Sequence, residues 1–214
     1  ENGSTITFRG NATDSNTVIL KYNSGTNTDK FALKLDGTSN IKFENLTIEN
    51  YSNTSPSLVE ITNNSSNITF ESVVLKSSLL STPAQEVAKL VNIIGANNNI
   101  TFNKDYFSGG AIGINSNLPT DTVSNNIVIT NSFFNYFGFN GISFDGANNI
   151  LIKNNKFREY ANGNISKAIS STYLYGTVEI SSNDIYLEGG TAVRAGIDIR
   201  KINASINSPV LIAN

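Results

Sequence analysis

Residues 97–107 read NNNITFNKDYF, and phrases of this kind recur along the chain. Each phrase places asparagine before an apolar anchor and a second apolar residue two positions after it. Apolar residues at every second position indicate strands with one buried face. Weaker copies lie around Ile6 and Val210. In the six clear copies the anchors are Ile41, Ile68, Ile100, Ile127, Ile150 and Val178.

Two further columns of this alignment are apolar in all six copies. The column two residues after the anchor holds Phe43, Phe70, Phe102, Ile129, Ile152 and Ile180. The column seven residues after the anchor holds Ile48, Leu75, Phe107, Phe134, Phe157 and Ile185. A further strand-like segment occurs at residues 31–37, 57–63, 111–117, 141–147 and 195–201. Each repeat therefore contains about three short strands joined by Asn/Gly turns.

A repeat of this size cannot bury its own apolar face and must stack on its neighbours. Successive anchors are 27, 32, 27, 23 and 28 residues apart, so loops of different length leave a constant coil. This predicts an all-β, right-handed parallel β-helix of about seven or eight coils, forming one domain over residues 1–214. A left-handed β-helix would show a stricter six-residue period. Residues 81–90, in the longest spacing, form either a helix or a surface loop.

Asparagine is unusually frequent, with 34 residues among 214. It accepts turn geometry and left-handed backbone, and stacked asparagine side chains can pass amide hydrogen bonds from one coil to the next. The residue before the anchor is asparagine in five successive copies. We therefore predict a structural ladder at one corner of the coil, formed by Asn40, Asn67, Asn99, Asn126 and Asn149.

The repeated phrases resemble the right-handed β-helix repeats of the pectate-lyase-like superfamily. The opening stretch, residues 4–48, resembles β-helix regions of large bacterial secreted or cell-surface proteins, notably those exported by the type IX secretion route. The resemblance covers nearly the whole chain. It implies an extracellular or cell-surface location and a role as an adhesin or polysaccharide-associated protein.

Composition excludes several classes of function. The chain has neither Cys nor His, which removes thiolate metal sites, the usual zinc sites and the Ser-His-Asp triad. A net charge of -2 without a basic cluster argues against nucleic acid as a partner. No apolar run reaches the roughly 18 residues of a membrane span.

Two acidic residues form the first candidate site. Glu44 and Glu71 occupy one outward column in adjacent coils, where two carboxylates could bind calcium or raise one pKa. We favour two solvated charges and leave calcium unsupported. Asn103 and Thr130 continue the column, so we expect no basic residue nearby. No metal site is assigned.

Other charged residues give no catalytic site. Asp198 and Arg200 share one strand face, which favours an ion pair or plain solvation over a clamp for a substrate carboxylate. Asp36 and Asp145 are interpreted as turn residues. No acid/base pair suited to glycoside hydrolysis is found. We therefore assign no catalytic residue.

The most distinctive local feature is NSFFNYFGFNGISF, residues 131–144. Its aromatic residues cannot all fit inside one coil, so some lie on a loop or an outer face. Exposed rings stack on sugars, while the alternative is that they cover a neighbouring coil or domain. The candidate carbohydrate-binding residues are Phe133, Tyr136, Phe137 and Phe139, with Tyr160 one coil later.

Two functions follow from these observations. The first is a non-catalytic extracellular rod whose partners are polysaccharide or neighbouring domains of the same chain. The second is a polysaccharide lyase or glycoside hydrolase acting on an acidic polysaccharide. The absence of histidine and of an acid/base pair favours the first. Neither end shows a capping helix, so we expect the natural chain to continue or an end to pack on a partner.

Overall fold

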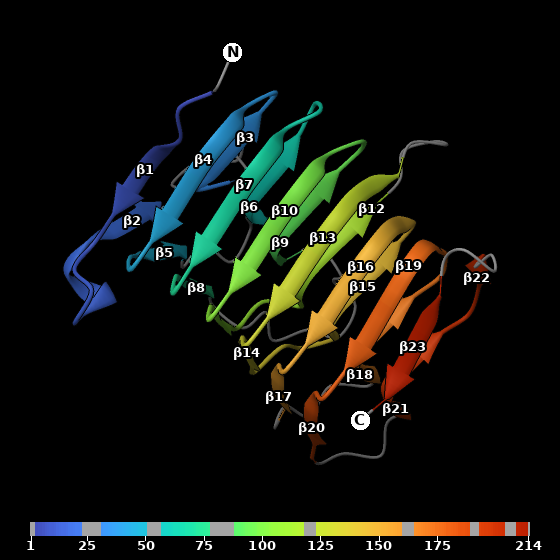
Figure 1. The fold of residues 1–214 in the computed structure, drawn as a ribbon. Coiled ribbons are helices and arrows are strands. Elements are labelled where there is room, and N and C mark those ends of the chain that lie inside the picture. The colour runs from blue at the N-terminus through green and yellow to red at the C-terminus, as the bar shows by residue number, and fades with distance from the viewer. Residues whose placement is uncertain are drawn as a thin grey trace.

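The computed structural model describes residues 3–22, 31–50, 57–77, 88–117, 123–159, 165–188, 193–203 and 209–213. The chain winds through three parallel sheets in turn, and nearly every strand pairs with the strand three places later in the sequence (Figure 1). The predicted all-β parallel solenoid is therefore confirmed. Its right-handed sense and its seven or eight coils stay predictions.

Each sheet is named after its first strand. The β1 sheet contains β1 (Ile6–Arg9), β4 (Ser39–Glu44), β7 (Ser66–Glu71), β10 (Asn98–Asn103), β13 (Ser124–Thr130), β16 (Ala147–Lys153) and β19 (Leu174–Ser181), and both β22 (Ile202–Asn203) and β23 (Val210–Ala213) pair with β19. The β2 sheet contains β2 (Ile19–Tyr22), β5 (Thr47–Asn50), β8 (Val74–Ser77), β11 (Tyr106–Ser108), β14 (Phe133–Asn135), β17 (Lys156–Glu159) and β20 (Asp184–Leu187). The β3 sheet contains β3 (Leu33–Asp36), β6 (Ser57–Thr62), β9 (Lys89–Ile94), β12 (Ile112–Asn117), β15 (Asn140–Asp145), β18 (Ile165–Ser171) and β21 (Val193–Ile199).

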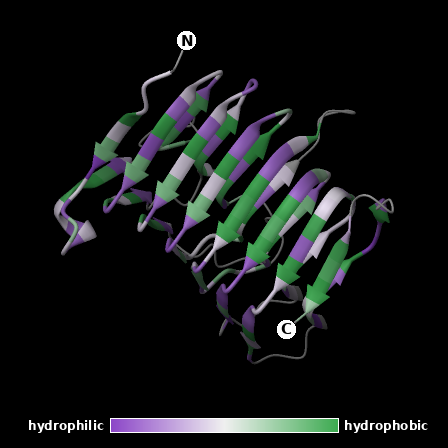
Figure 2. Cartoon of the chain, in the orientation of Figure 1, coloured by the Kyte–Doolittle hydropathy of each residue, from purple (hydrophilic) through white to green (hydrophobic). Residues whose placement is uncertain are grey.

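Strand pairing follows the columns of the sequence alignment. Ile6 pairs with Ile41, and Ile100 pairs with Ile68 on one side and Ile127 on the other. The anchors from Ile68 to Val178 are buried, and alternate residues of the same strands point outward. Figure 2 shows the resulting bands of hydrophobic and hydrophilic residues along the strands of the β1 sheet.

Aromatic side chains stack inside the solenoid. Phe43, Phe70 and Phe102 lie one above another with ring centroids 5.1 Å apart. In the third column the rings of Phe107 and Phe134 are 4.4 Å apart, and Phe157 follows at 4.7 Å. These distances match the separation of neighbouring strands, so each ring packs on its equivalent in the next coil.

The corner that enters the β1 sheet is built from the predicted asparagines. Asn40, Asn67, Asn99, Asn126 and Asn149 all have φ between 54° and 58°, in the left-handed region that asparagine tolerates. Nδ2 of each later residue donates to Oδ1 of the one before: Asn67 to Asn40 at 2.9 Å, Asn99 to Asn67 at 2.8 Å and Asn126 to Asn99 at 2.9 Å.

Beyond Asn126 the ladder asparagine bonds to backbone instead of to another asparagine of the ladder. Oδ1 of Asn149 accepts a hydrogen bond from the backbone N–H of Thr177 at 3.0 Å. Gly176 lies at this corner with a φ of 64°, and a Cβ there would stand 2.1 Å from Oδ1 of Asn148. Close approach of the asparagine side chains therefore leaves room only for glycine.

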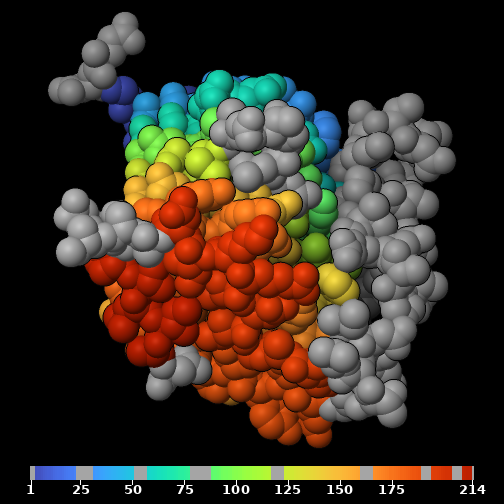
Figure 3. Space-filling model, turned by 90° about the vertical axis from the view of Figure 1, so that its right-hand side faces the viewer, coloured from blue at the N-terminus to red at the C-terminus, as the bar shows by residue number. Residues whose placement is uncertain are grey.

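Both ends of the solenoid expose residues of the core columns. Ile6 is 58% exposed and Phe8 is 48% exposed, although the anchors from Ile68 to Val178 and the second-column residues from Phe43 to Ile180 are buried. At the other end Ile212, which pairs with the buried Ile180 of the second column, is also exposed. Figure 3 views this end, where the last strands in orange and red form much of the described surface.

Residues 81–87, the main part of the predicted helix or loop, lie outside the described residues. Lys89 and Leu90, at its end, belong to β9. In the described part of the chain no helix has the length and hydrophobicity needed to cross a membrane.

Candidate functional site

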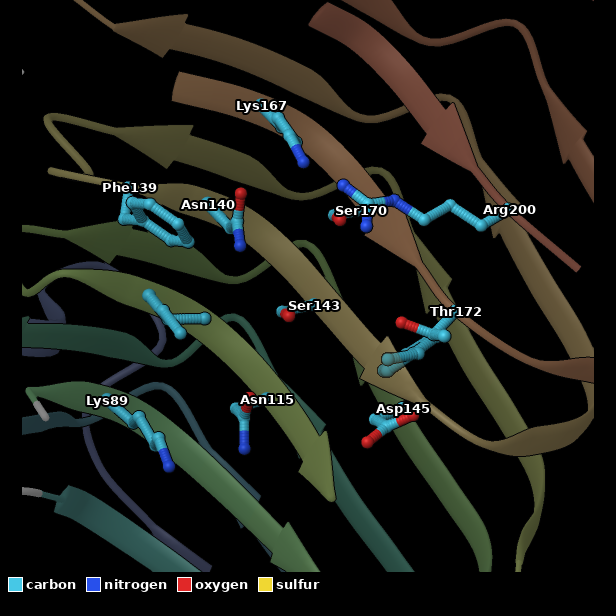
Figure 4. Close-up of a pocket in the computed structure, with 12 residues that line it drawn as sticks. Lys89, Asn115, Phe139, Asn140, Ser143, Asp145, Lys167, Ser170, Thr172 and Arg200 are labelled. Atoms are coloured by element: carbon cyan, nitrogen blue, oxygen red, sulfur yellow. The ribbon is translucent and has the colours of Figure 1, made fainter. Parts of the chain in front are cut away.

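A polar groove of about 410 Å³ lies on the outer face of the β3 sheet (Figure 4). Strands β9, β12, β15 and β18 form its floor, and Arg200, just after β21, reaches it from a fifth coil. Amides, hydroxyls and cationic groups dominate this surface. The lining residues are Lys89, Ile112, Asn115, Phe139, Asn140, Ser143, Phe144, Asp145, Lys167, Ser170, Thr172 and Arg200.

The hollow arises from a change of side-chain size along one outward column. Strand pairing stacks Asn92, Asn115, Ser143 and Ser170 in successive coils. Nδ2 of Asn115 donates to Oδ1 of Asn92 at 2.9 Å, so the lower part of the column is filled by linked amides. The two serines above are shorter, and space opens over them.

An ion-pair cluster bounds the groove beside Ser170. Nζ of Lys167 lies 2.6 Å from Oδ2 of Asp198, and Nη2 of Arg200 lies 3.6 Å from the same oxygen. The hydrogen bond from Lys167, followed by the charges of Lys167 and Arg200, outweighs desolvation and lowers the pKa of Asp198. The sequence leaves both ion pairing and plain solvation open for Asp198 and Arg200, and the structure shows the ion pair; Lys167 adds a shorter contact that sequence reasoning missed.

The opposite wall combines an aromatic ring with a buried amide. Phe139 packs against Ala88, Ala111 and Ile112, and one part of its ring faces the groove. Asn140 is buried beside it, and its Oδ1 accepts no hydrogen bond from the described residues. This wall therefore offers an apolar surface next to a hydrogen-bond acceptor.

The donor set suits binding better than acid–base chemistry. Asp145 is the only carboxylate among the described lining residues. No group of three or more acidic residues that could hold a metal ion occurs among the residues that the structure describes. Glycoside hydrolysis requires a pair of carboxyl groups that flank the scissile bond. The described groove supplies hydroxyl, amide and cationic groups instead.

The Glu44–Glu71 column has basic neighbours, contrary to expectation. The two residues pair across β4 and β7, as predicted. Glu44 forms ion pairs with Arg9 and with Lys42, the latter at 2.6 Å, and the hydrogen bond from Lys42 lowers its pKa. Nζ of Lys104 lies 3.5 Å from Glu71. The prediction failed because it followed the column in one direction only and ignored Lys42 and the corner residues.

Asp36 and Asp145, predicted as turn residues, are instead the last residues of β3 and β15. Asp36 pairs with Lys34 at 2.9 Å, and this hydrogen bond is the main reason its pKa is lowered. Strand pairing places Asp145 at the edge of the groove.

The predicted aromatic residues do not form one platform. Phe133 lies on the outer face of the β2 sheet, edge-to-face with Tyr106 at 5.4 Å and with Nζ of Lys156 at 5.4 Å from its ring centroid. Tyr136 is 43% exposed at the end of β14, and Phe139 reaches the groove. Phe137 requires a correction: it is 2% exposed and belongs to the core, so it cannot contact a sugar. Tyr160 lies outside the described residues.

Most groove residues were not recognised from the sequence. A signal was present, since Asn115, Ser143 and Asp145 lie in segments predicted as strands. Residues 89–94 and 165–171 were not singled out as strands, and without them Lys89, Lys167 and Ser170 could not be placed on the same face.

No protein-family model matches the chain, and no curated protein matches it. Among solved structures it is similar to the crystal structure of PfbA, a surface adhesin of Streptococcus pneumoniae, with a TM-score of 0.47 and 16% sequence identity. The match covers 79% of this chain and 52% of that chain, so the present chain spans about half the length of PfbA's.

Proposed function

We propose that the chain is a non-catalytic, extracellular β-solenoid of adhesin type that contacts polysaccharide through the groove on the β3 sheet. The groove is the observation that carries this proposal. Ser143 and Ser170 offer hydroxyl donors and acceptors one strand apart, about 4.8 Å, beside the buried amide of Asn115. Phe139 supplies an apolar edge against which a sugar ring can lie.

The rod shape supports the binding role. Parallel coils repeat the same outward positions along the axis, so an extended polymer can meet equivalent groups in several coils. The extracellular location rests on the resemblance of residues 4–48 to β-helix regions of bacterial surface proteins. Neighbouring domains of the same chain are further partners in this role.

The proposal is tested by probing a glycan array with the wild-type chain and with Ser143→Trp. Ser143 lies in the middle of β15 and points outward, so a larger side chain fills the groove without entering the core. We expect the wild type to bind a polysaccharide and the variant to lose at least about tenfold in affinity. Thr101→Trp is the matched control, because Thr101 is a half-buried outward residue in the middle of β10, on the β1 sheet.

Each glycan bound is then incubated with the protein and examined for shortened or unsaturated products. Binding without product supports a non-catalytic role. Product formation would overturn that role in favour of a lyase or hydrolase. Equal binding by wild type and Ser143→Trp would remove the groove from the proposal, and an array without any bound glycan would contradict polysaccharide contact altogether.

A further inference from the structure

An interior polar position recurs at the corner between the β1 and β2 sheets. In four successive coils it holds Asp105, Ser132, Asn155 and Asn183, all buried. Each side chain accepts a hydrogen bond from the backbone N–H of the preceding coil. Oδ1 of Asp105 accepts from Val73 at 2.7 Å, as Oδ1 of Asn155 accepts from Ser132 at 2.9 Å and Oδ1 of Asn183 from Asn155 at 3.0 Å.

The two asparagines also donate into the solenoid wall. Nδ2 of Asn155 donates to the carbonyl of Ile129 at 2.8 Å, and Nδ2 of Asn183 donates to the carbonyl of Ile152 at 3.0 Å. Ile129 and Ile152 are the second-column residues of the coil before. For Asp105 the equivalent second-column residue is Phe70, which pairs with Phe102 in the coil of Asp105.

Asp105 has an oxygen where the asparagines have an NH₂ group. Its Oδ1 makes the same backbone contact as the asparagines make. By analogy with them, its Oδ2 corresponds to Nδ2, and the equivalent acceptor is the carbonyl of Phe70. Oδ2 is buried and has no hydrogen-bond partner among the described residues. Two acceptors that face each other in a dry interior repel, whereas a protonated carboxyl group has a donor to offer.

We propose that Asp105 is protonated in the folded protein and donates a hydrogen bond to the carbonyl of Phe70, so that this corner of the solenoid weakens as the pH rises. The carboxylic acid replaces an asparagine of the interior ladder. Unlike asparagine, it can lose its donor, which makes this coil a pH-sensitive point in the rod.

The surrounding charges favour the protonated form. Burial is the main cause that raises the pKa of Asp105 well above 3.8, and the Glu71 carboxylate on β7 raises it further, while backbone hydrogen bonds of Val73 and Asn103 oppose this shift. Lys104, next in sequence, has its ammonium group 3.5 Å from Glu71. On the other side, residues 124–135, which contain β13 and β14, have no ionisable side chain.

The sign of the pH effect follows from the raised pKa. The contribution of Asp105 to stability is fully present below the unfolded-state value, near 3.8. Above that value the folded protein holds one more proton than the unfolded chain, so stability falls as the pH rises until the folded-state pKa is passed. Between the unfolded-state and folded-state pKa values, a rise of one pH unit lowers Tm by about 3 to 5 °C for a chain of this size.

The test compares thermal unfolding of wild type and Asp105→Asn between pH 4 and pH 9. We expect similar Tm values near pH 4 and a difference in favour of Asp105→Asn that grows by about 3 to 5 °C per pH unit until the folded-state pKa is passed. Asp145→Asn, at the exposed end of β15, is the matched control and should follow the wild type at every pH. A Tm difference that is constant with pH would overturn the proposal.

A second measurement needs no variant. In wild-type protein labelled with ¹³C at aspartate carboxyl groups, the Asp105 signal should change from a protonated acid to a carboxylate at a higher pH than the signals of the exposed aspartates. An Asp105 signal that changes at the same pH as those of the exposed aspartates, or at a lower pH, would overturn the proposal even if Asp105→Asn failed to fold.

Discussion

Asn126 donates a hydrogen bond from Nδ2 to Oδ1 of Asn99 at 2.9 Å, and both residues have left-handed backbone. The same relationship joins Asn99 to Asn67 at 2.8 Å. Asparagine therefore serves two purposes at this corner: it accepts a φ near 55° and it links the side chains of successive coils. These purposes can be separated by substitution.

Asn99→Ala should destabilise the chain by about 2 to 3 kcal/mol, because alanine is strained at positive φ and the ladder hydrogen bonds are lost. Asn99→Gly loses the same hydrogen bonds but no φ strain, and should cost about 1 kcal/mol. Urea unfolding of the two variants measures both terms. Equal losses would show that backbone conformation contributes little at this corner.

Gly141→Ala should destabilise the chain by about 1 to 3 kcal/mol through overpacking. A Cβ at this position would lie 2.7 Å from the carbonyl oxygen of Ala168 and 2.8 Å from the ring of Phe157. Gly138→Ala is the matched control, since the nearest atom to its added Cβ is 3.7 Å away. Urea midpoints should fall for Gly141→Ala and stay nearly unchanged for Gly138→Ala, and the reverse order would contradict the packing described for β15.

Glu49→Gln should reduce the acid sensitivity of the fold. Burial raises the pKa of Glu49, but hydrogen bonds from Lys76 and Lys21, whose Nζ atoms lie 3.1 and 3.2 Å away, lower it below 4.5. Its contribution is therefore present above pH 4.5 and is lost as the pH falls through the lowered value.

Unfolding of wild type and Glu49→Gln from pH 7 to pH 2 should show a stability difference that is largest above pH 4.5 and shrinks in acid. Glu188→Gln, an exposed change just after β20, is the control and should show no such trend. A difference that grows as the pH falls would disprove the role assigned to the two lysines.

Phe137→Ala should cost about 3 to 5 kcal/mol because it leaves a cavity in the core. The adjacent exposed residue provides a contrast: Tyr136→Ala should cost less than about 1 kcal/mol. Thermal unfolding distinguishes the two. Similar small losses of stability for both variants would indicate that Phe137 is exposed and would support the predicted aromatic platform.

The parallel solenoid and its core columns could be predicted because every coil places apolar residues at the same buried positions. Ile100, Phe102 and Phe107 are recognised as inward by their equivalents in five other copies, and stacking then brings equivalent residues together. The asparagine ladder is predictable for the same reason. Both features depend on comparing like positions, which an alignment of the chain with itself supplies.

The groove depends on differences between coils. Ser143 leaves a hollow only because strand pairing places it above Asn115, and Lys167 meets Asp198 only because β18 and β21 are adjacent. Phe137 and Phe139 differ by two positions, yet one enters the core and the other reaches the groove, since the chain turns between β14 and β15. The sequence by itself determined the periodic core, because burial repeats with the coil. Only the tertiary structure decided the binding surface, because that surface is made of contacts between coils that do not repeat.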